Sequence, residues 1–129
     1  LRQMHRLKTG ALLRGSVMMG AACREPDGTI HAATEQALSR FGDAIGLAFQ
    51  VVDDILDVTT DTAILGKTAG KDAAADKPTY VSVLGLERSR DYVQELYAQA
   101  MAALDASGLA APSTRALRAL AGVVVHRDK

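Results

Sequence analysis

The chain has 129 residues, the length of one domain with a modest hydrophobic core. Fifteen basic and fifteen acidic residues give no net charge, so the charge balance does not favour nucleic acid or an anionic membrane as a partner. Apolar residues make up 48% of the sequence and aromatic residues only 4%, a composition typical of packed helices. No run of about 18 apolar residues and no signal-peptide pattern occurs, so we expect a soluble, cytoplasmic protein without membrane insertion. The single cysteine, Cys23, is expected to fill core space in a reducing compartment.

The first predicted helix extends from Leu1 to about Cys23, where apolar residues recur at helical intervals. Gly10, Gly15 and Gly20 interrupt it at a cost of up to about 1 kcal/mol each, which is tolerable where another helix comes close. We therefore expect this helix to be central in the fold. Because the pattern is already helical at its first residue, we also expect the chain to be a piece of a longer protein.

A second, long helix is predicted from a cap at Thr29 to about Val58. It carries three aspartates, Asp53, Asp54 and Asp57, in an otherwise apolar run. At 100° per residue these aspartates and Gln50 fall within about 100° of one another. The four polar groups are therefore predicted to share one face.

This acidic face opposes its own helix by roughly 2–3 kcal/mol, because Asp is a poor helix former and the like charges repel. It is also predicted to lie at the C-terminal end of the helix, where the dipole disfavours negative charge. A hard divalent cation such as Mg²⁺ would relieve both effects and keep positions for water and substrate phosphate oxygens. The alternative is a solvated acidic face without a ligand.

Residues 59–78 lack sustained apolar periodicity and are predicted to form a mobile loop that faces phosphate. Lys67, Lys71 and Lys77 of this loop could close over a phosphate group. A Gly-Lys-Thr triplet within it is similar to the end of a nucleotide P-loop. We reject that motif because Asp61 stands where it requires Gly, and a helix rather than a strand precedes it.

The remaining sequence predicts packing helices. Thr79 is the expected cap of a short helix broken near Gly85, and a longer helix follows over residues 87–106. A last helix is predicted after Pro112, with Ser113 as its cap. No segment favours a β-strand, so the predicted fold class is all-α.

The stretch Phe49-Gln50-x-x-Asp53-Asp54-x-x-Asp57, followed by Leu65-Gly66-Lys67 and Asp76-Lys77-Pro78-Thr79-Tyr80, resembles the trans-isoprenyl (polyprenyl) diphosphate synthases, most closely the short-chain bacterial farnesyl diphosphate synthase group. The resemblance covers essentially the whole chain but only the C-terminal half of the family's domain. It implies a single partial domain over residues 1–129, the C-terminal half of the isoprenoid synthase helical bundle. The family's first aspartate-rich motif belongs to the earlier half, and no second D-D-x-x-D occurs here.

The resemblance implies an Mg²⁺-dependent prenyltransferase that condenses isopentenyl diphosphate with dimethylallyl or geranyl diphosphate, head to tail, to give geranyl or farnesyl diphosphate. It further implies a homodimer, with no nucleic-acid partner. The metal is assigned to Asp53, Asp54 and Asp57. Catalytic contacts with the allylic diphosphate are assigned to Lys8, Thr9, Gln50, Lys67 and Lys77. A basic tail that helps close the site and contacts substrate corresponds to Arg127 and Lys129.

Two other hypotheses stay open. A non-catalytic helical subunit, or a diphosphate-binding partner of a synthase, would explain the missing first motif and the large apolar stripe. A terpene cyclase would use similar Mg²⁺ chemistry on a related fold. Under the prenyltransferase hypothesis, the 129-residue chain alone is predicted to be inactive because it carries only half of the site.

Overall fold

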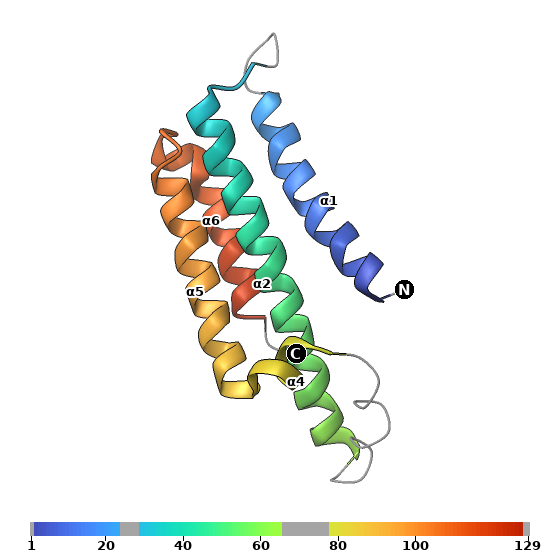
Figure 1. Cartoon of the computed structure of the whole chain (residues 1–129). Coiled ribbons are helices and arrows are strands. Elements are labelled where there is room, and N and C mark those ends of the chain that lie inside the picture. Colours follow the sequence, from blue (N-terminus) through green and yellow to red (C-terminus); the bar gives the residue numbers. More distant parts are fainter. Residues whose placement is uncertain (1, 24–28, 66–77, 128–129) are drawn as a thin grey trace.

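The computed structural model describes residues 2–23, 29–65 and 78–127, with side chains described for 9–23, 29–60 and 78–127. All regular structure within these ranges is helical, which confirms the predicted all-α class. The helices, shown in Figure 1, are α1 (Arg2–Ala22), α2 (Ala32–Leu65), α4 (Tyr80–Leu84), α5 (Leu86–Asp105) and α6 (Ala111–Val125). None of the described helices combines the length and apolar character needed to cross a membrane.

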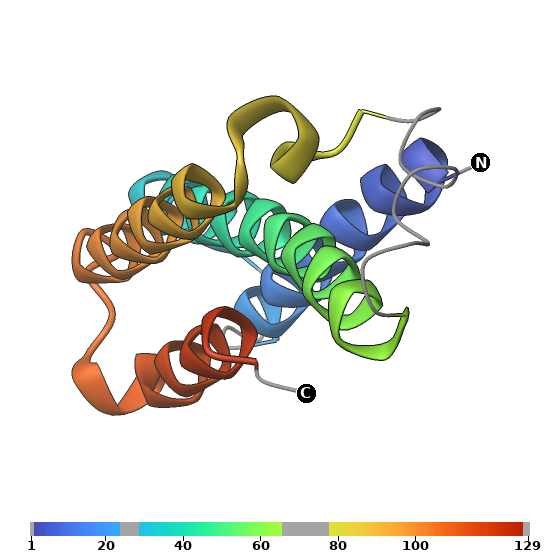
Figure 2. The same cartoon turned by 90° about the horizontal axis from the view of Figure 1, so that it is seen from below.

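Helix α2 is the centre of the bundle. It contacts α1, α4, α5 and α6, whereas α1 contacts α2 alone among the described helices. Figures 1 and 2 show α1 and α5 flanking α2 on different sides. The expectation that the first helix is central is therefore wrong for this part of the molecule. A central helix would be covered on several sides, but Leu12 and Met19 of α1 remain 71% and 67% exposed.

The core lies where α2 meets α5 and α6, and it follows the apolar stripe predicted for the long helix. Phe41 is the largest fully buried side chain, and burying a side chain of this size contributes about 2–3 kcal/mol. One cluster comprises Leu38, Phe41, Ala44, Ile45, Ala100, Ala103, Leu104, Ala121 and Val124. A second cluster comprises Ala48, Val51, Val52, Val93, Leu96 and Val125. The second cluster lies directly beneath the acidic stretch of α2.

Glycines bring α1 and α2 into close contact. A Cβ added at Gly42 would lie 2.9 Å from Cα of Arg14, and one added at Gly46 would lie 3.1 Å from Cα of Gly10. Gly10 lies beside Gly46, whereas Arg14, later in α1, lies beside the earlier Gly42 of α2. The two helices therefore run antiparallel. The close approach expected at Gly10 is confirmed. The two later glycines of α1 have no neighbouring described atom within 4 Å of an added Cβ.

Helix α2 continues past the predicted end at Val58 and stops at Leu65. The hydroxyl of Thr59 donates to the carbonyl of Ile55 at 2.9 Å and lies 3.2 Å from that of Leu56, so a residue that favours loops is accommodated inside the helix. The acidic motif therefore does not end the helix, and the unfavourable dipole position expected for it is wrong. The rest of the expected loop, residues 66–77, lies outside the described residues.

The short helix α4 has the predicted boundaries. Backbone N–H of Ser82 donates to Oγ1 of Thr79 at 3.0 Å, while Oγ of Ser82 accepts from backbone N–H of Thr79 at 2.8 Å. This capping box satisfies donors that the helix start would otherwise leave unpaired. Gly85, with φ of 83°, ends α4 and lets the chain turn directly into α5.

Two local expectations are corrected. Helix α6 begins at Ala111 with Pro112 in its first turn, so Ser113 lies inside the helix instead of capping it. Cys23 is exposed just beyond the end of α1 and does not fill core space.

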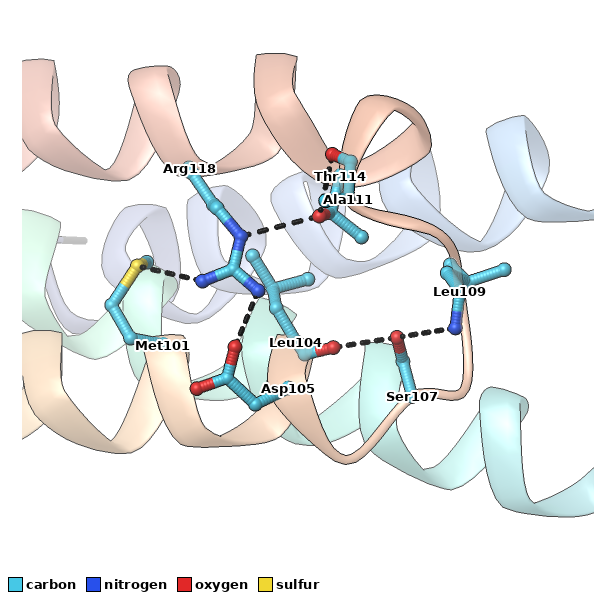
Figure 3. Close-up of polar contacts among 8 residues, drawn as sticks. All are labelled: Met101, Leu104, Asp105, Ser107, Leu109, Ala111, Thr114 and Arg118. Carbon is cyan, nitrogen blue, oxygen red and sulfur yellow. Dashed lines mark hydrogen bonds and ion pairs between the residues drawn. The ribbon is translucent and has the colours of Figure 1, made fainter.

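A polar corner fixes α6 against α5 (Figure 3). Arg118 donates to Oδ1 of Asp105 at 2.5 Å and to Oγ1 of Thr114 at 3.2 Å. The buried hydroxyl of Ser107 donates to the carbonyl of Leu104 at 2.6 Å. These contacts set the position of α6 and therefore the point at which the chain leaves its C-terminal end.

Candidate active site

Asp53 lies on the exposed side of α2 and has one cationic partner among the described residues. Nη2 of Arg127 donates to Oδ1 of Asp53 at 3.2 Å. The same guanidinium lies over the ring of Phe49, with 4.6 Å from Cζ to the ring centroid. Phe49 and Asp53 are one helical turn apart, so Arg127 spans successive turns of α2. Arg127, the last described residue, therefore contacts the first aspartate of the motif.

Asp54 has a different environment, because its residue is only 1% exposed. Its Oδ2 accepts a hydrogen bond from backbone N–H of Tyr80 at 2.9 Å, at the first residue of α4. A carboxylate at a helix N-terminus gains a charge-assisted hydrogen bond and a favourable position in the helix dipole. Asp54 thus joins α4 to α2 across a sequence separation of 26 residues.

Gln50 and Asp57 complete the predicted face. Asp57 is exposed one turn after Asp53, whereas Gln50 is half-buried. Nε2 of Gln50 lies 3.8 Å from the position that a Cβ at Gly10 would take, so this side chain reaches α1 beside Thr9. The acidic face is consequently divided. Asp53 and Asp57 face the open side, and Asp54 is covered by α4.

The predicted diphosphate contacts are only partly described. Thr9 is half-buried on α1, next to the residue that Gln50 approaches. The backbone of Lys8 belongs to α1, but its side chain lies outside the described residues. Lys67, Lys77 and Lys129 also lie outside them. The roles assigned to these lysines by resemblance stay predictions.

Arg127 is the residue for which the structure adds most. The resemblance assigned it to a tail near substrate, but no sequence signal indicated that it pairs with Asp53, which lies 74 residues earlier. Its Nε is buried and has no hydrogen-bond partner among the described residues. A buried unpaired donor costs about 1–3 kcal/mol, so the ion pair and the ring contact together must offset that cost.

The donor set on this face suits a hard divalent ion, although it does not enclose one. Within the described ranges, no three His, Cys, Asp or Glu residues gather closely enough to hold a metal ion. The carboxylates of Asp53 and Asp57 are hard oxygen donors on successive turns, and a guanidinium already occupies one of them. Mg²⁺ commonly takes one or two carboxylates and fills its other positions with water and substrate phosphate. Such an ion fits these residues.

A cavity of about 440 Å³ lies at the other end of α2, far along the chain from the acidic motif. The start of α2 and the C-terminal part of α1 line it, together with the connection from α5 to α6. Among the described residues that line it, His31 is the only titratable one, and none is Asp, Glu, Lys or Arg. It does not provide the chemistry that the sequence predicted.

Comparisons with known proteins identify the family of the chain. The sequence model of the family Polyprenyl synthetase matches residues 1–108. The chain belongs to the polyprenyl synthetase family. This finding confirms the resemblance inferred from the acidic motif, and it accounts for the all-α bundle.

Individual relatives in this family are considerably longer than the chain. It is 42% identical over 129 residues to farnesyl diphosphate synthase of Escherichia coli, and it covers 42% of that protein. It is 45% identical over 125 residues to the chloroplastic geranylgeranyl pyrophosphate synthase of Capsicum annuum and covers 32% of it. A crystal structure from Marinomonas sp. MED121, provisionally described as a farnesyl-diphosphate synthase, matches 95% of this chain and 38% of its own, with 35% identity and a TM-score of 0.70. The chain therefore spans less than half the length of these relatives.

Proposed function

We propose that this chain is the C-terminal part of an Mg²⁺-dependent prenyltransferase. The reaction joins isopentenyl diphosphate to an allylic diphosphate, dimethylallyl or geranyl, and gives geranyl or farnesyl diphosphate plus diphosphate. The observation that carries the proposal is the pair of exposed carboxylates, Asp53 and Asp57, with a cation already bound to the first of them. Family membership supports the reaction class.

Bound at Asp53 and Asp57, Mg²⁺ would supply positive charge to the allylic diphosphate. Lys8, Lys67 and Lys77 would bind the same group and stabilise the negative charge that grows on it as its C–O bond breaks. Diphosphate leaves with the electron pair of that bond. The double bond of isopentenyl diphosphate then forms the new C–C bond, and one proton is lost.

The other polar groups of the face have positioning roles in this proposal. Thr9 and Gln50, brought together where α1 meets α2, would orient the diphosphate by hydrogen bonds. Asp54 would hold the start of α4 beside the motif, and this start directly follows Lys77 in the sequence. The apolar walls of the bundle would exclude water from the carbocation.

The proposal extends to the whole protein. The first aspartate-rich motif is absent from this sequence, so the 129 residues alone are expected to be inactive. We also propose a homodimer in the cytoplasm, as the resemblance to the family and the lone cysteine led us to expect. A non-catalytic subunit of a synthase is the second candidate, and the exposure of Leu12, Met19, Leu120 and Val123 favours it.

A chimera separates the two candidates. The 129 residues would replace the matching C-terminal part of the Escherichia coli synthase, to which they align over their full length. Condensation of labelled isopentenyl diphosphate with geranyl diphosphate is then measured with Mg²⁺ and with EDTA. We expect turnover that EDTA abolishes and that Asp53→Ala lowers at least about 100-fold.

Asp43→Ala is the matched control, because Asp43 is an exposed aspartate on the same helix, paired only loosely with Arg14 at 3.9 Å. We expect it to keep full turnover. A chimera that is folded, as judged by circular dichroism, yet inactive would favour the non-catalytic subunit. Equal turnover in the two aspartate variants would remove Asp53 from the metal site.

A further inference from the structure

Arg127 pairs with Asp53, a carboxylate to which the proposed function assigns a metal ion. Its Nη2 lies 3.2 Å from Oδ1 of Asp53, and its guanidinium covers the ring of Phe49. The Arg127 side chain is 32% exposed, while the other partner in the ion pair is 55% exposed. The contact thus lies at the boundary between protein and solvent, where a dissolved cation can compete for the same carboxylate.

We infer that Arg127 is a resident counter-cation of Asp53 that competes with the divalent ion. In the chain without metal, it neutralises the first aspartate and is held over Phe49. When the ion binds, Arg127 leaves the carboxylate, so metal occupancy and the position of this arginine are linked. The inference rests on the metal site of the proposed function, and it adds a role for Arg127 before any substrate is present.

The fixed charge of the guanidinium favours this competition. Arginine does not lose its proton at any ordinary pH, so it cannot relieve repulsion from a divalent ion by becoming neutral. An ion on Asp53 is therefore repelled by the fixed charge of Arg127, whichever carboxylate oxygen binds the ion. By linkage, the factor by which the ion weakens the Arg127 contact equals the factor by which Arg127 weakens binding of the ion.

The hold on Arg127 is incomplete, which permits release. The contact with Asp53 is a single hydrogen bond and not the two-pronged pair that arginine forms with carboxylates at ideal geometry. The buried Nε lacks an acceptor among the described residues. Arg127 therefore has an unmet hydrogen bond that it can satisfy elsewhere after it leaves Asp53.

Release does not require the bundle to move. Val124 and Val125 are buried in the core, and the last helical contact runs from backbone N–H of His126 to the carbonyl of Gly122 at 2.9 Å. Arg127 follows directly after this contact. Rotation of its side chain and of the backbone beyond His126 is sufficient, while α6 stays in place.

The test measures Mn²⁺ binding to the 129-residue chain by electron paramagnetic resonance and repeats it with Mg²⁺ by calorimetry. We expect Arg127→Gln to bind Mn²⁺ about five- to tenfold more tightly, because a positive charge close to the ion is removed. Arg115→Gln removes the same charge from an exposed position of α6 and is expected to stay within about twofold of the parent chain. Arg127→Lys keeps the charge and is expected to stay close to the parent.

A second readout follows Arg127 directly. The Nε–Hε signal of Arg127 in a nitrogen-15 spectrum should be protected from solvent exchange without metal, and should lose that protection at saturating Mg²⁺. This signal reports the movement even if Arg127→Gln folds poorly.

The outcomes are separable. Unchanged or weaker Mn²⁺ binding in Arg127→Gln, or an Nε–Hε signal that Mg²⁺ leaves unmoved, would overturn the competition while the metal site itself stands. If the parent chain and Arg127→Gln both fail to bind Mn²⁺ above the Asp53→Asn background, the competition is overturned, because no ion reaches Asp53 without substrate. The metal site of the proposed function is then judged separately by the Asp53→Ala chimera, in which substrate is present. Asp53→Asn should abolish binding and defines the background.

Discussion

The hydrogen bond between Asp54 and α4 allows a test in which two models predict opposite signs. If Asp54 serves only as a metal ligand, Asp54→Ala should stabilise the metal-free chain. Replacing Asp by Ala improves helix propensity by up to about 0.7 kcal/mol, and loss of the repulsion with Asp57 adds about 0.2–0.5 kcal/mol. The total would be a gain of about 1 kcal/mol.

The structure predicts the reverse. Removing Asp54 forfeits a charge-assisted hydrogen bond to Tyr80 worth about 1.5–3 kcal/mol, and it leaves a helix donor without its acceptor. It also removes a side chain that is almost fully buried, which costs about 1 kcal/mol more. After subtracting the propensity and repulsion gains, we expect a net loss of about 1–3 kcal/mol.

The assay is urea unfolding of the metal-free chain, followed by circular dichroism. For a slope of about 2 kcal/mol/M, the midpoint of Asp54→Ala should fall by about 0.5–1.5 M. Asp57→Ala is the matched control, an exposed aspartate on the same helix, and its midpoint should hold or rise. A midpoint that rises equally in both variants would refute the anchoring role of Asp54.

Two further changes test the packing of the helices against one another. Gly42→Ala places a Cβ 2.9 Å from Cα of Arg14, a backbone atom that cannot turn away, so we expect a loss of about 1–3 kcal/mol, measured by urea unfolding. Gly15→Ala, with no described neighbour near the added Cβ, should instead be neutral or stabilise by up to about 1 kcal/mol, and a loss as large as that of Gly42→Ala would contradict the observed helix contact. Arg118→Ala removes the partly exposed pair with Asp105 and should lower the free energy of unfolding by about 1 kcal/mol, which is measured as a modest fall in the thermal midpoint. If Arg118→Ala has the same thermal midpoint as the parent chain, both in buffer and in 1 M salt, the contacts of Arg118 do not fix α6.

Local signals in the sequence were sufficient for much of the fold. Helix α4 starts after Thr79 and ends at Gly85, as predicted. A capping box and a glycine with positive φ depend only on residues close by in the sequence. The end of α2 could not be predicted in this way. Thr59 satisfies its hydroxyl at the carbonyl of Ile55 inside the helix, and the residue type alone does not distinguish this use from a cap or a turn.

The candidate site shows the same limit over longer distances. Helical spacing correctly placed Asp53, Asp57 and Gln50 on neighbouring parts of one side of α2. It could not show that Asp54 is buried, because the partner that buries it, Tyr80, is 26 residues away. Nor could it pair Arg127 with Asp53, since that contact depends on the path of α5 and α6.

The attachment of α1 to α2 alone also has a dynamic consequence. A helix held on one side only can detach while α2 stays packed against α5 and α6, and only the part of the core cluster covered by Val17, Met18 and Ala21 of α1 is then exposed. Its amides should therefore exchange with solvent through a partial opening of lower free energy than the global unfolding that exposes the amides of α2. Because Gln50 reaches α1 beside Thr9, each such opening also separates two of the groups assigned to the diphosphate. Partial opening of α1 would therefore move Thr9 away from Gln50 while Asp53 and Asp57 stay exposed on α2.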